Sequence, residues 1–80
     1  MNNDDRFDGK QIYETNSAGP AVYDIRGNRI HEAGIASQAK YEIRGNDIRE
    51  FMIASQPKFE IKGNKIYEYM SAGQAIYDIR

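Results

Sequence analysis

The chain has 80 residues, a formal net charge of −1, 29% charged residues and 40% hydrophobic residues, a composition typical of one small globular domain. The near-neutral charge argues against electrostatic binding of nucleic acid or anionic lipid, and the absence of cysteine excludes disulfides and thiolate metal sites. Eleven Ile, six Tyr and three Phe, with neither Leu nor Trp, favour β-strands.

Residues 1–8 (MNNDDRFD) form a polar N-terminal arm. They lack the apolar segment of a signal peptide, and no later run is long and apolar enough to span a membrane, so we expect no membrane association and a cytoplasmic location. The end of the arm resembles the tail of the repeated unit that follows, with Phe7 in the place of a repeated isoleucine.

Residues 9–80 consist of four units of 18 residues, 9–26, 27–44, 45–62 and 63–80, that follow one another without a gap. Gly, Ile, Glu, Ala and a second Ile are identical in all four units, at unit positions 1, 4, 6, 10 and 17. Position 15 is always Tyr or Phe. The repetition predicts a single domain in which each unit is one structural module that its neighbours complete.

Each unit boundary predicts a β-hairpin. A Gly-Asn pair separates alternating strands in Tyr23–Ile30, Tyr41–Ile48 and Phe59–Ile66, and Gly suits the first position of a type II′ turn because it accepts a positive φ. A second loop, around SAGP, IASQ, IASQ and SAGQ, returns the chain within each unit. The sequence therefore predicts an all-β fold, an eight-stranded antiparallel up-and-down meander.

A β-solenoid with one coil per unit is the alternative for an 18-residue period. It would stack the four repeated glutamates in parallel, about 4.8 Å apart, and such a ladder of like charges is unfavourable. This cost favours the meander.

The segment VYDIRGNRI, Val22–Ile30, resembles the hairpin motif of YD repeats. These belong to a broader class of short hairpin-repeat proteins that includes choline-binding wall modules and MORN repeats. The resemblance implies hairpin repeats over residues 9–80, and no ligand-binding residue is carried over with it.

One face of the predicted sheet carries an unbroken row of isoleucines, which we interpret as a self-association face. Its members are Ile12, Ile25, Ile30, Ile43, Ile48, Ile61, Ile66 and Ile79. Burying eight isoleucines contributes on the order of 16 kcal/mol, so the row must be covered. The opposite face is a mosaic of charges.

The second loop decides how the row is covered. An Ala-Gly or Ala-Ser tip leaves an open sheet that pairs with a second copy. A Gly-Pro, Ser-Gln or Gly-Gln tip shifts each hairpin by two residues, and four shifts give a shear of about eight, compatible with a closed eight-stranded barrel. Because the barrel would place four glutamates inside, at a desolvation cost, we prefer the open sheet.

Beside the isoleucines runs a row of rings and carboxylates that could stack on a sugar or hold a quaternary ammonium group. Its members are Tyr23, Tyr41, Phe59, Tyr77, Glu32, Glu50 and Glu68. The glutamates could also bind a divalent cation. The single histidine, His31, faces Asp24 on the charged side without a nucleophile to complete a catalytic group, so we expect no catalytic residues and no cofactor.

These observations predict a non-enzymatic β-hairpin repeat protein that acts by protein–protein association or self-assembly. We expect a homo-oligomer, with a dimer favoured, and another protein as the further partner. The alternative is a small ligand- or glycan-binding module that uses the Tyr/Glu row.

Overall fold

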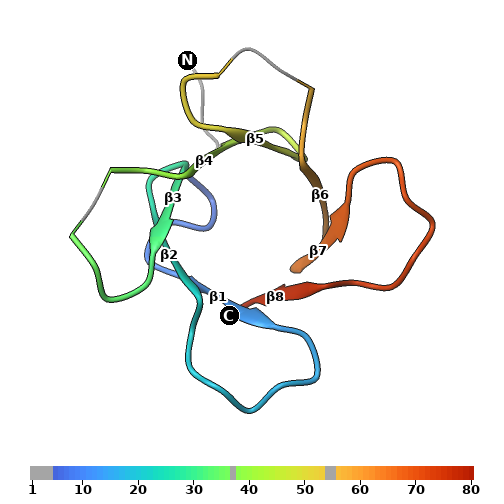
Figure 1. The fold of residues 1–80 in the computed structure, drawn as a ribbon, viewed down its shortest axis with the longest axis horizontal. Coiled ribbons are helices and arrows are strands. Elements are labelled where there is room, and N and C mark those ends of the chain that lie inside the picture. The colour runs from blue at the N-terminus through green and yellow to red at the C-terminus, as the bar shows by residue number, and fades with distance from the viewer. Residues whose placement is uncertain (1–4, 37, 54–55) are drawn as a thin grey trace.

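The computed structural model describes residues 5–36, 38–53 and 56–80, and within them it contains strands and no helix. The strands are β1 (Gln11–Glu14), β2 (Tyr23–Arg26), β3 (Arg29–Glu32), β4 (Tyr41–Arg44), β5 (Asp47–Glu50), β6 (Phe59–Lys62), β7 (Lys65–Glu68) and β8 (Tyr77–Ile79). Each strand pairs antiparallel with the next, and β8 pairs with β1, so the sheet closes into a barrel (Figure 1). The all-β up-and-down meander is confirmed, and the parallel solenoid is excluded.

The preferred open sheet was wrong, and the closed barrel is the observed form. The register explains why: Ile12 pairs with Tyr23, two residues away from Ile25, the partner that an unshifted hairpin would give it. The junctions β3–β4, β5–β6 and β7–β8 slip in the same way. Four slips of two residues make a shear of eight, which suits eight strands.

The Gly-Asn turns join the strands at one end of the barrel, which we call the turn end. Gly27, Gly45 and Gly63 have φ values between 60° and 65°, and a Cβ at any of them would meet open space. Glycine is therefore required for its backbone conformation and not for close packing. Each turn also forms a backbone hydrogen bond with the next hairpin. In the first of these, the amide of Ile43 donates to the carbonyl of Asn28 over 2.7 Å.

The eight repeated isoleucines fill the barrel and are 0–2% exposed. They line the interior of one chain, where a second copy cannot reach them. The self-association face predicted from Ile12, Ile25, Ile30, Ile43, Ile48, Ile61, Ile66 and Ile79 is therefore corrected: closure covers this row without a partner.

The N-terminal arm closes the turn end. Phe7 is 9% exposed and belongs to the core cluster. A carboxylate oxygen of Asp8 accepts a hydrogen bond from the amide of Gly27 over 2.6 Å, and the guanidinium of Arg6 donates to the carbonyl of Gly45. Phe7 does not take the isoleucine place that its sequence position suggests, because Ile79 of β8 pairs with Ile12 there.

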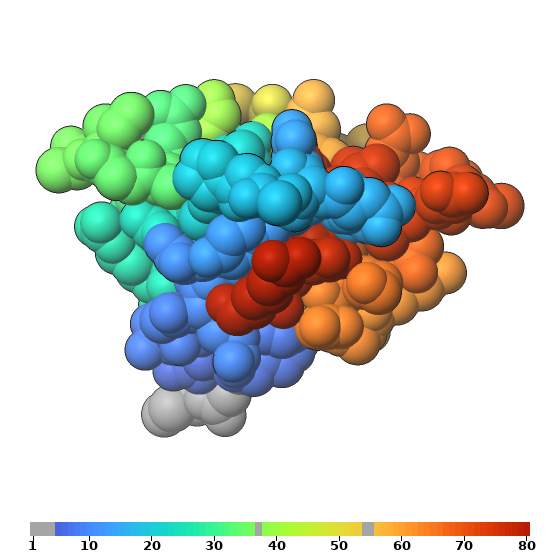
Figure 2. Space-filling model, turned by 90° about the horizontal axis from the view of Figure 1, so that it is seen from below, coloured from blue at the N-terminus to red at the C-terminus, as the bar shows by residue number. Residues whose placement is uncertain are grey.

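Four longer loops leave the opposite end, which we call the loop end. They are the first loop (15–22), the second (33–40), the third (51–58) and the fourth (69–76). The loops spread outward around the barrel like blades (Figure 1), and the side view shows them as a broad layer above the N-terminal arm (Figure 2). The molecule measures 33 × 31 × 20 Å, so it is a flat body with one broad face made by the loops.

Candidate functional site: the loop end of the barrel

Four aromatic rings close the loop end. Tyr23, Tyr41, Phe59 and Tyr77 each begin a strand directly after a loop. Each ring meets its two neighbours edge to face, with centroids 5.6–6.0 Å apart and interplanar angles of 77–81°. This geometry is favourable for aromatic pairs, and here it forms a closed four-membered ring.

The cavity beneath the rings is too small for a ligand. Its volume is about 10 Å³, and its other walls are Ile12, Ile30, Ile48 and Ile66. Such a space holds about one water molecule at most. The rings are also turned toward one another, so the row that was predicted to stack on sugars comes together as a packed layer over the core.

Burial acts on the pKa of one ring hydroxyl, that of Tyr23. Burial of Tyr23, with hydrogen bonds and unfavourable charge interactions from Tyr41 and Tyr77, raises the pKa of its hydroxyl well above the ordinary value. Tyr23 is therefore a neutral hydroxyl across the physiological range. Phe59, the remaining member of the ring, has no hydroxyl to add to this group.

The four repeated glutamates form the rim around the rings, and we call them the rim glutamates: Glu14, Glu32, Glu50 and Glu68. Each one pairs across strands with an aromatic residue of the ring, as Glu32 does with Tyr23. The expected burial of these carboxylates inside the barrel was wrong. They end the strands where the loops diverge, and none of the described polar or charged residues is buried.

Lysines neutralise one side of the rim. The ammonium of Lys40 lies 3.6 Å from a carboxylate oxygen of Glu32, and that of Lys58 lies 3.6 Å from one of Glu50. Both lysines stand at unit position 14. The first and fourth units carry Val22 and Ile76 at this position, so the charge pattern of the rim differs from unit to unit.

The loops hold large apolar side chains in water: Ile35 is 52% exposed, Met52 84%, Ile53 55% and Met70 81%. Met52 and Met70 also have φ values of 62° and 61°. Sequence reasoning missed these residues. The sequence does contain a signal for the two methionines. They occupy unit position 8, where the first two units have Asn and Gly, residue types that are typical of a positive φ.

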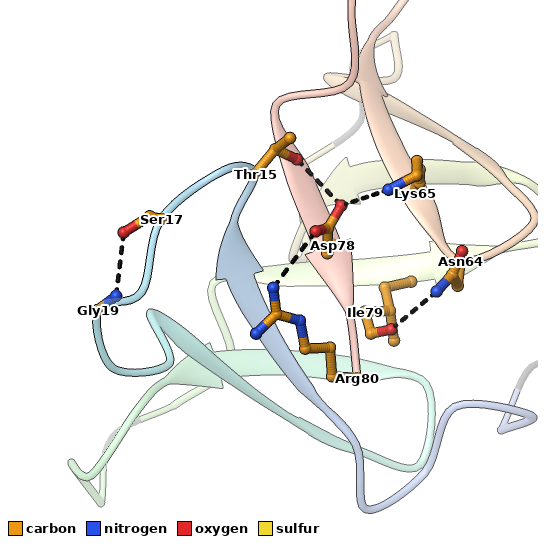
Figure 3. Close-up of polar contacts among 8 residues, drawn as sticks. All are labelled: Thr15, Ser17, Gly19, Asn64, Lys65, Asp78, Ile79 and Arg80. Carbon is orange, nitrogen blue, oxygen red and sulfur yellow. Dashed lines mark hydrogen bonds and ion pairs between the residues drawn. The ribbon is translucent and has the colours of Figure 1, made fainter.

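Two carboxylates tie loops to the barrel wall. Asp78 accepts hydrogen bonds from the hydroxyl of Thr15 and the ammonium of Lys65, both over 3.0 Å, with Arg80 at 3.6 Å (Figure 3). The bond from Lys65, with the bond from Thr15 and the charge of Arg80, lowers the pKa of Asp78.

Asp24 has the corresponding place in the first unit. It accepts hydrogen bonds from the side chain of Gln11 over 2.8 Å and from the amide of Gly34, and these two bonds lower its pKa. His31 pairs with it across strands β2 and β3, as the sequence predicted. The anchoring bonds give both carboxylates a structural role.

Within the described ranges, no three His, Cys, Asp or Glu side chains are grouped so that they could hold a metal ion. No helix in this part of the chain is long and apolar enough to cross a membrane. Comparison with known proteins finds no matching family model, no matching curated protein and no matching solved structure.

Proposed function

We propose that this protein is a non-enzymatic module that acts by protein–protein association, and that the loop end is its contact surface. The observation that carries the proposal is the exposure of Ile35, Met52, Ile53 and Met70 on the loops. The core needs none of these side chains, because the eight isoleucines already fill the barrel. Apolar side chains that a partner covers are typical of association surfaces.

The backbone supports the same reading. A non-glycine residue in the left-handed region costs roughly 1–2 kcal/mol, less for Asn. Asn16 and Gly34 take this conformation at low cost in the first two units, whereas Met52 and Met70 add that strain to the exposure of a long apolar side chain. A partner that buries the methionines would offset both costs.

The loop end also has a suitable size. A disc of 33 × 31 Å has an area of roughly 800 Å², about what each partner buries in a standard interface. Methionine side chains are flexible and adapt to irregular surfaces, which suits them to contacts of this kind. The partner can be a second copy or a different protein.

The glycan-binding alternative has weaker support. The four rings of the loop end pack edge to face in a closed ring, which leaves less free ring surface for a stacked sugar. Support for the absence of an enzymatic role comes from Asp24 and Asp78, whose carboxylates are engaged in holding loops.

The methionines make the proposal testable. The chain contains only Met1, Met52 and Met70, so ¹³C-methyl labelling gives three signals, assigned with Met52→Leu and Met70→Leu. If copies associate, the Met52 and Met70 signals move with concentration as sedimentation detects larger species. The Ile35→Ser, Ile53→Ser double variant should lose this dependence.

Photo-methionine tests for a different partner. The analogue, incorporated in the cells that express the protein, places a cross-linker at Met52 and Met70, and a variant with leucine at both positions is the control. A discrete adduct that the control lacks supports the proposal. A strict monomer with unmoved methyl signals and no specific adduct would contradict it.

A further inference from the structure

A groove lies at the seam of the barrel, where β8 meets β1, between the fourth loop and the first. We call it the seam groove. Its volume is about 470 Å³, and its lining is Glu14, Thr15, Asn16, Gln74, Ala75, Ile76 and Tyr77. The amide of Thr15 donates to the carbonyl of Ile76 over 3.1 Å, which fixes the two loops side by side at its base.

The repeat supplies an equivalent groove between β6 and β7, which we call the Lys58 groove. Its volume is about 410 Å³, and its lining is Gln56, Pro57, Lys58, Phe59, Glu68 and Tyr69. The amide of Tyr69 donates to the carbonyl of Lys58, just as Thr15 donates to Ile76. The two grooves therefore have one backbone plan. The rim glutamate is kept and Ile76 replaces Lys58; Thr15, Ala75 and Tyr77 also stand in place of Tyr69, Pro57 and Phe59.

The order of residues around the rim isolates one carboxylate. Glu50 lies between the position-14 residues Lys40 and Lys58, and it is paired with Lys58. Glu32 is paired with Lys40, and Glu68 shares its groove with Lys58.

Glu14 is different from the other three rim glutamates. Its neighbours at unit position 14 are Val22, across the first loop, and Ile76, across the seam, and neither carries a positive charge. The seam groove thus combines an exposed carboxylate, an apolar side chain and two amide side chains, those of Asn16 and Gln74, with no cation in its lining.

We propose that the seam groove binds a lysine or arginine side chain of a protein partner. The aliphatic stem would lie on Ala75 and Ile76, and the cation would meet the carboxylate of Glu14, with the amide oxygens of Asn16 and Gln74 as further acceptors. Within the chain, lysines at unit position 14 already pair with rim glutamates, as Lys58 does with Glu50. The identity of the partner as a protein rests on the proposed function; the preference for a cation on an apolar stem is tested separately.

A small probe tests the groove directly. Backbone NMR of the full chain is followed during titration with N-acetyl-lysine methylamide at millimolar concentrations, with the norleucine analogue as an uncharged control of similar shape. We expect saturable shifts at Thr15, Asn16 and residues 74–77 with the lysine probe alone, and their loss in high salt. Glu14→Gln should abolish them, whereas Glu68→Gln should leave them unchanged.

Exchanging the two grooves is the decisive experiment. Ile76→Lys places a cation in the groove lining and should weaken binding at the seam by charge repulsion, whereas Lys58→Ile removes the cation from the Lys58 groove and should create saturable shifts at Tyr69 and residues 56–59. Three results would each overturn the proposal: no saturable shifts in the natural sequence, equal shifts with the norleucine analogue, or shifts that survive both Glu14→Gln and Ile76→Lys. If the probe binds but the methionine signals do not depend on concentration and no adduct forms, cation binding in the seam groove is supported and the proposed association is contradicted. If association is observed but the probe does not bind, only the proposal for the seam groove is contradicted.

Discussion

The two ends of the barrel obey different constraints. At the turn end, three Gly-Asn turns share one conformation, and Phe7 closes the core. At the loop end, the aromatic ring and the rim glutamates repeat, but the loops above them change from unit to unit. Residues that form the barrel wall therefore repeat from unit to unit, and most of the variation between units lies in the loops.

The units also divide the loop end into two halves. The second and third loops carry Ile35, Met52 and Ile53, and lysines neutralise the glutamates beside them. In the first and fourth loops a serine hydroxyl accepts a hydrogen bond from a glycine two residues later, as in Ser17 and Gly19 (Figure 3). Here Glu14 lacks a lysine. Met70, also exposed, lies in the fourth loop, so apolar side chains occur in both halves, and the halves differ mainly in the charge of the rim.

The largest expected effect comes from the core that both ends share. Ile43 is fully buried, so Ile43→Lys should cost on the order of 3 kcal/mol or more of unfolding free energy, because no partner awaits the charge. Lys40→Ala is the matched change on the surface, where loss of an exposed ion pair should cost less than about 1 kcal/mol. Urea denaturation measures both. A mild effect of Ile43→Lys would mean that the isoleucines do not line a closed barrel.

The second prediction tests the closure of the turn end. Phe7→Ala should destabilise the fold by about 3 kcal/mol, because it removes a buried ring from the core cluster. Phe51→Ala is the comparison at the loop end. Its half-buried ring packs under the guanidinium of Arg29 at 4.8 Å, and this change should cost about 1 kcal/mol. Equal midpoints for the two variants would show that Phe7 does not close the barrel.

Much of the fold could be predicted from the sequence because the period and the Gly-Asn pairs specify hairpins locally. Ile25 faces Ile30 by turn geometry alone, and the structure has this pairing. Closure could not be predicted in the same way, because it depends on the register across the second loop. Ile12 could pair with Tyr23 or with Ile25, and the sequence of the loop does not determine which of the two registers forms. The cost assigned to buried glutamates gave the wrong choice, because these carboxylates stop at the rim.

The candidate site was predicted less well, for a related reason. The cross-strand pairs of glutamates with aromatic residues that the meander predicts are present, but the sequence does not show that the rings face one another. The exposed residues Met52 and Met70 occupy a loop position without strand periodicity, so pattern reasoning assigned them no role. The isolation of Glu14 needs the barrel, because Ile76 becomes its neighbour only when β8 meets β1.

The third prediction compares positive-φ positions at the two ends and expects opposite signs. Gly27→Ala should cost about 1 kcal/mol, because alanine strains the left-handed conformation that the turn requires. Met52→Asn should stabilise the fold by a few tenths of a kcal/mol, because Asn tolerates the conformation that Asn16 already adopts at this unit position. Thermal melts give both signs. If Met52→Asn also weakens association, the strained methionine contributes to binding and not to the stability of the fold. A Met52→Asn variant that melts at a lower temperature than the natural sequence would contradict the proposed strain.

The smallest effect should appear in acid, at the bond between loop and wall. The pKa of Asp78 is lowered in the folded state by Lys65, Thr15 and Arg80, so its ionised form adds stability above the unfolded value, near pH 4, and this contribution is lost as the pH falls through the folded value. Asp78→Asn should therefore have a flatter melting-temperature profile below about pH 4.

Thr15→Val, which keeps the charge and removes one hydrogen bond, should lie between that variant and the natural sequence. A profile for Asp78→Asn that parallels the natural one would contradict the anchoring role. Because Thr15 also lines the seam groove, protonation of Asp78 should loosen the groove before the barrel melts. In that case, the amide signal of Thr15 shifts in acid while those of the buried isoleucines, such as Ile43, remain in place.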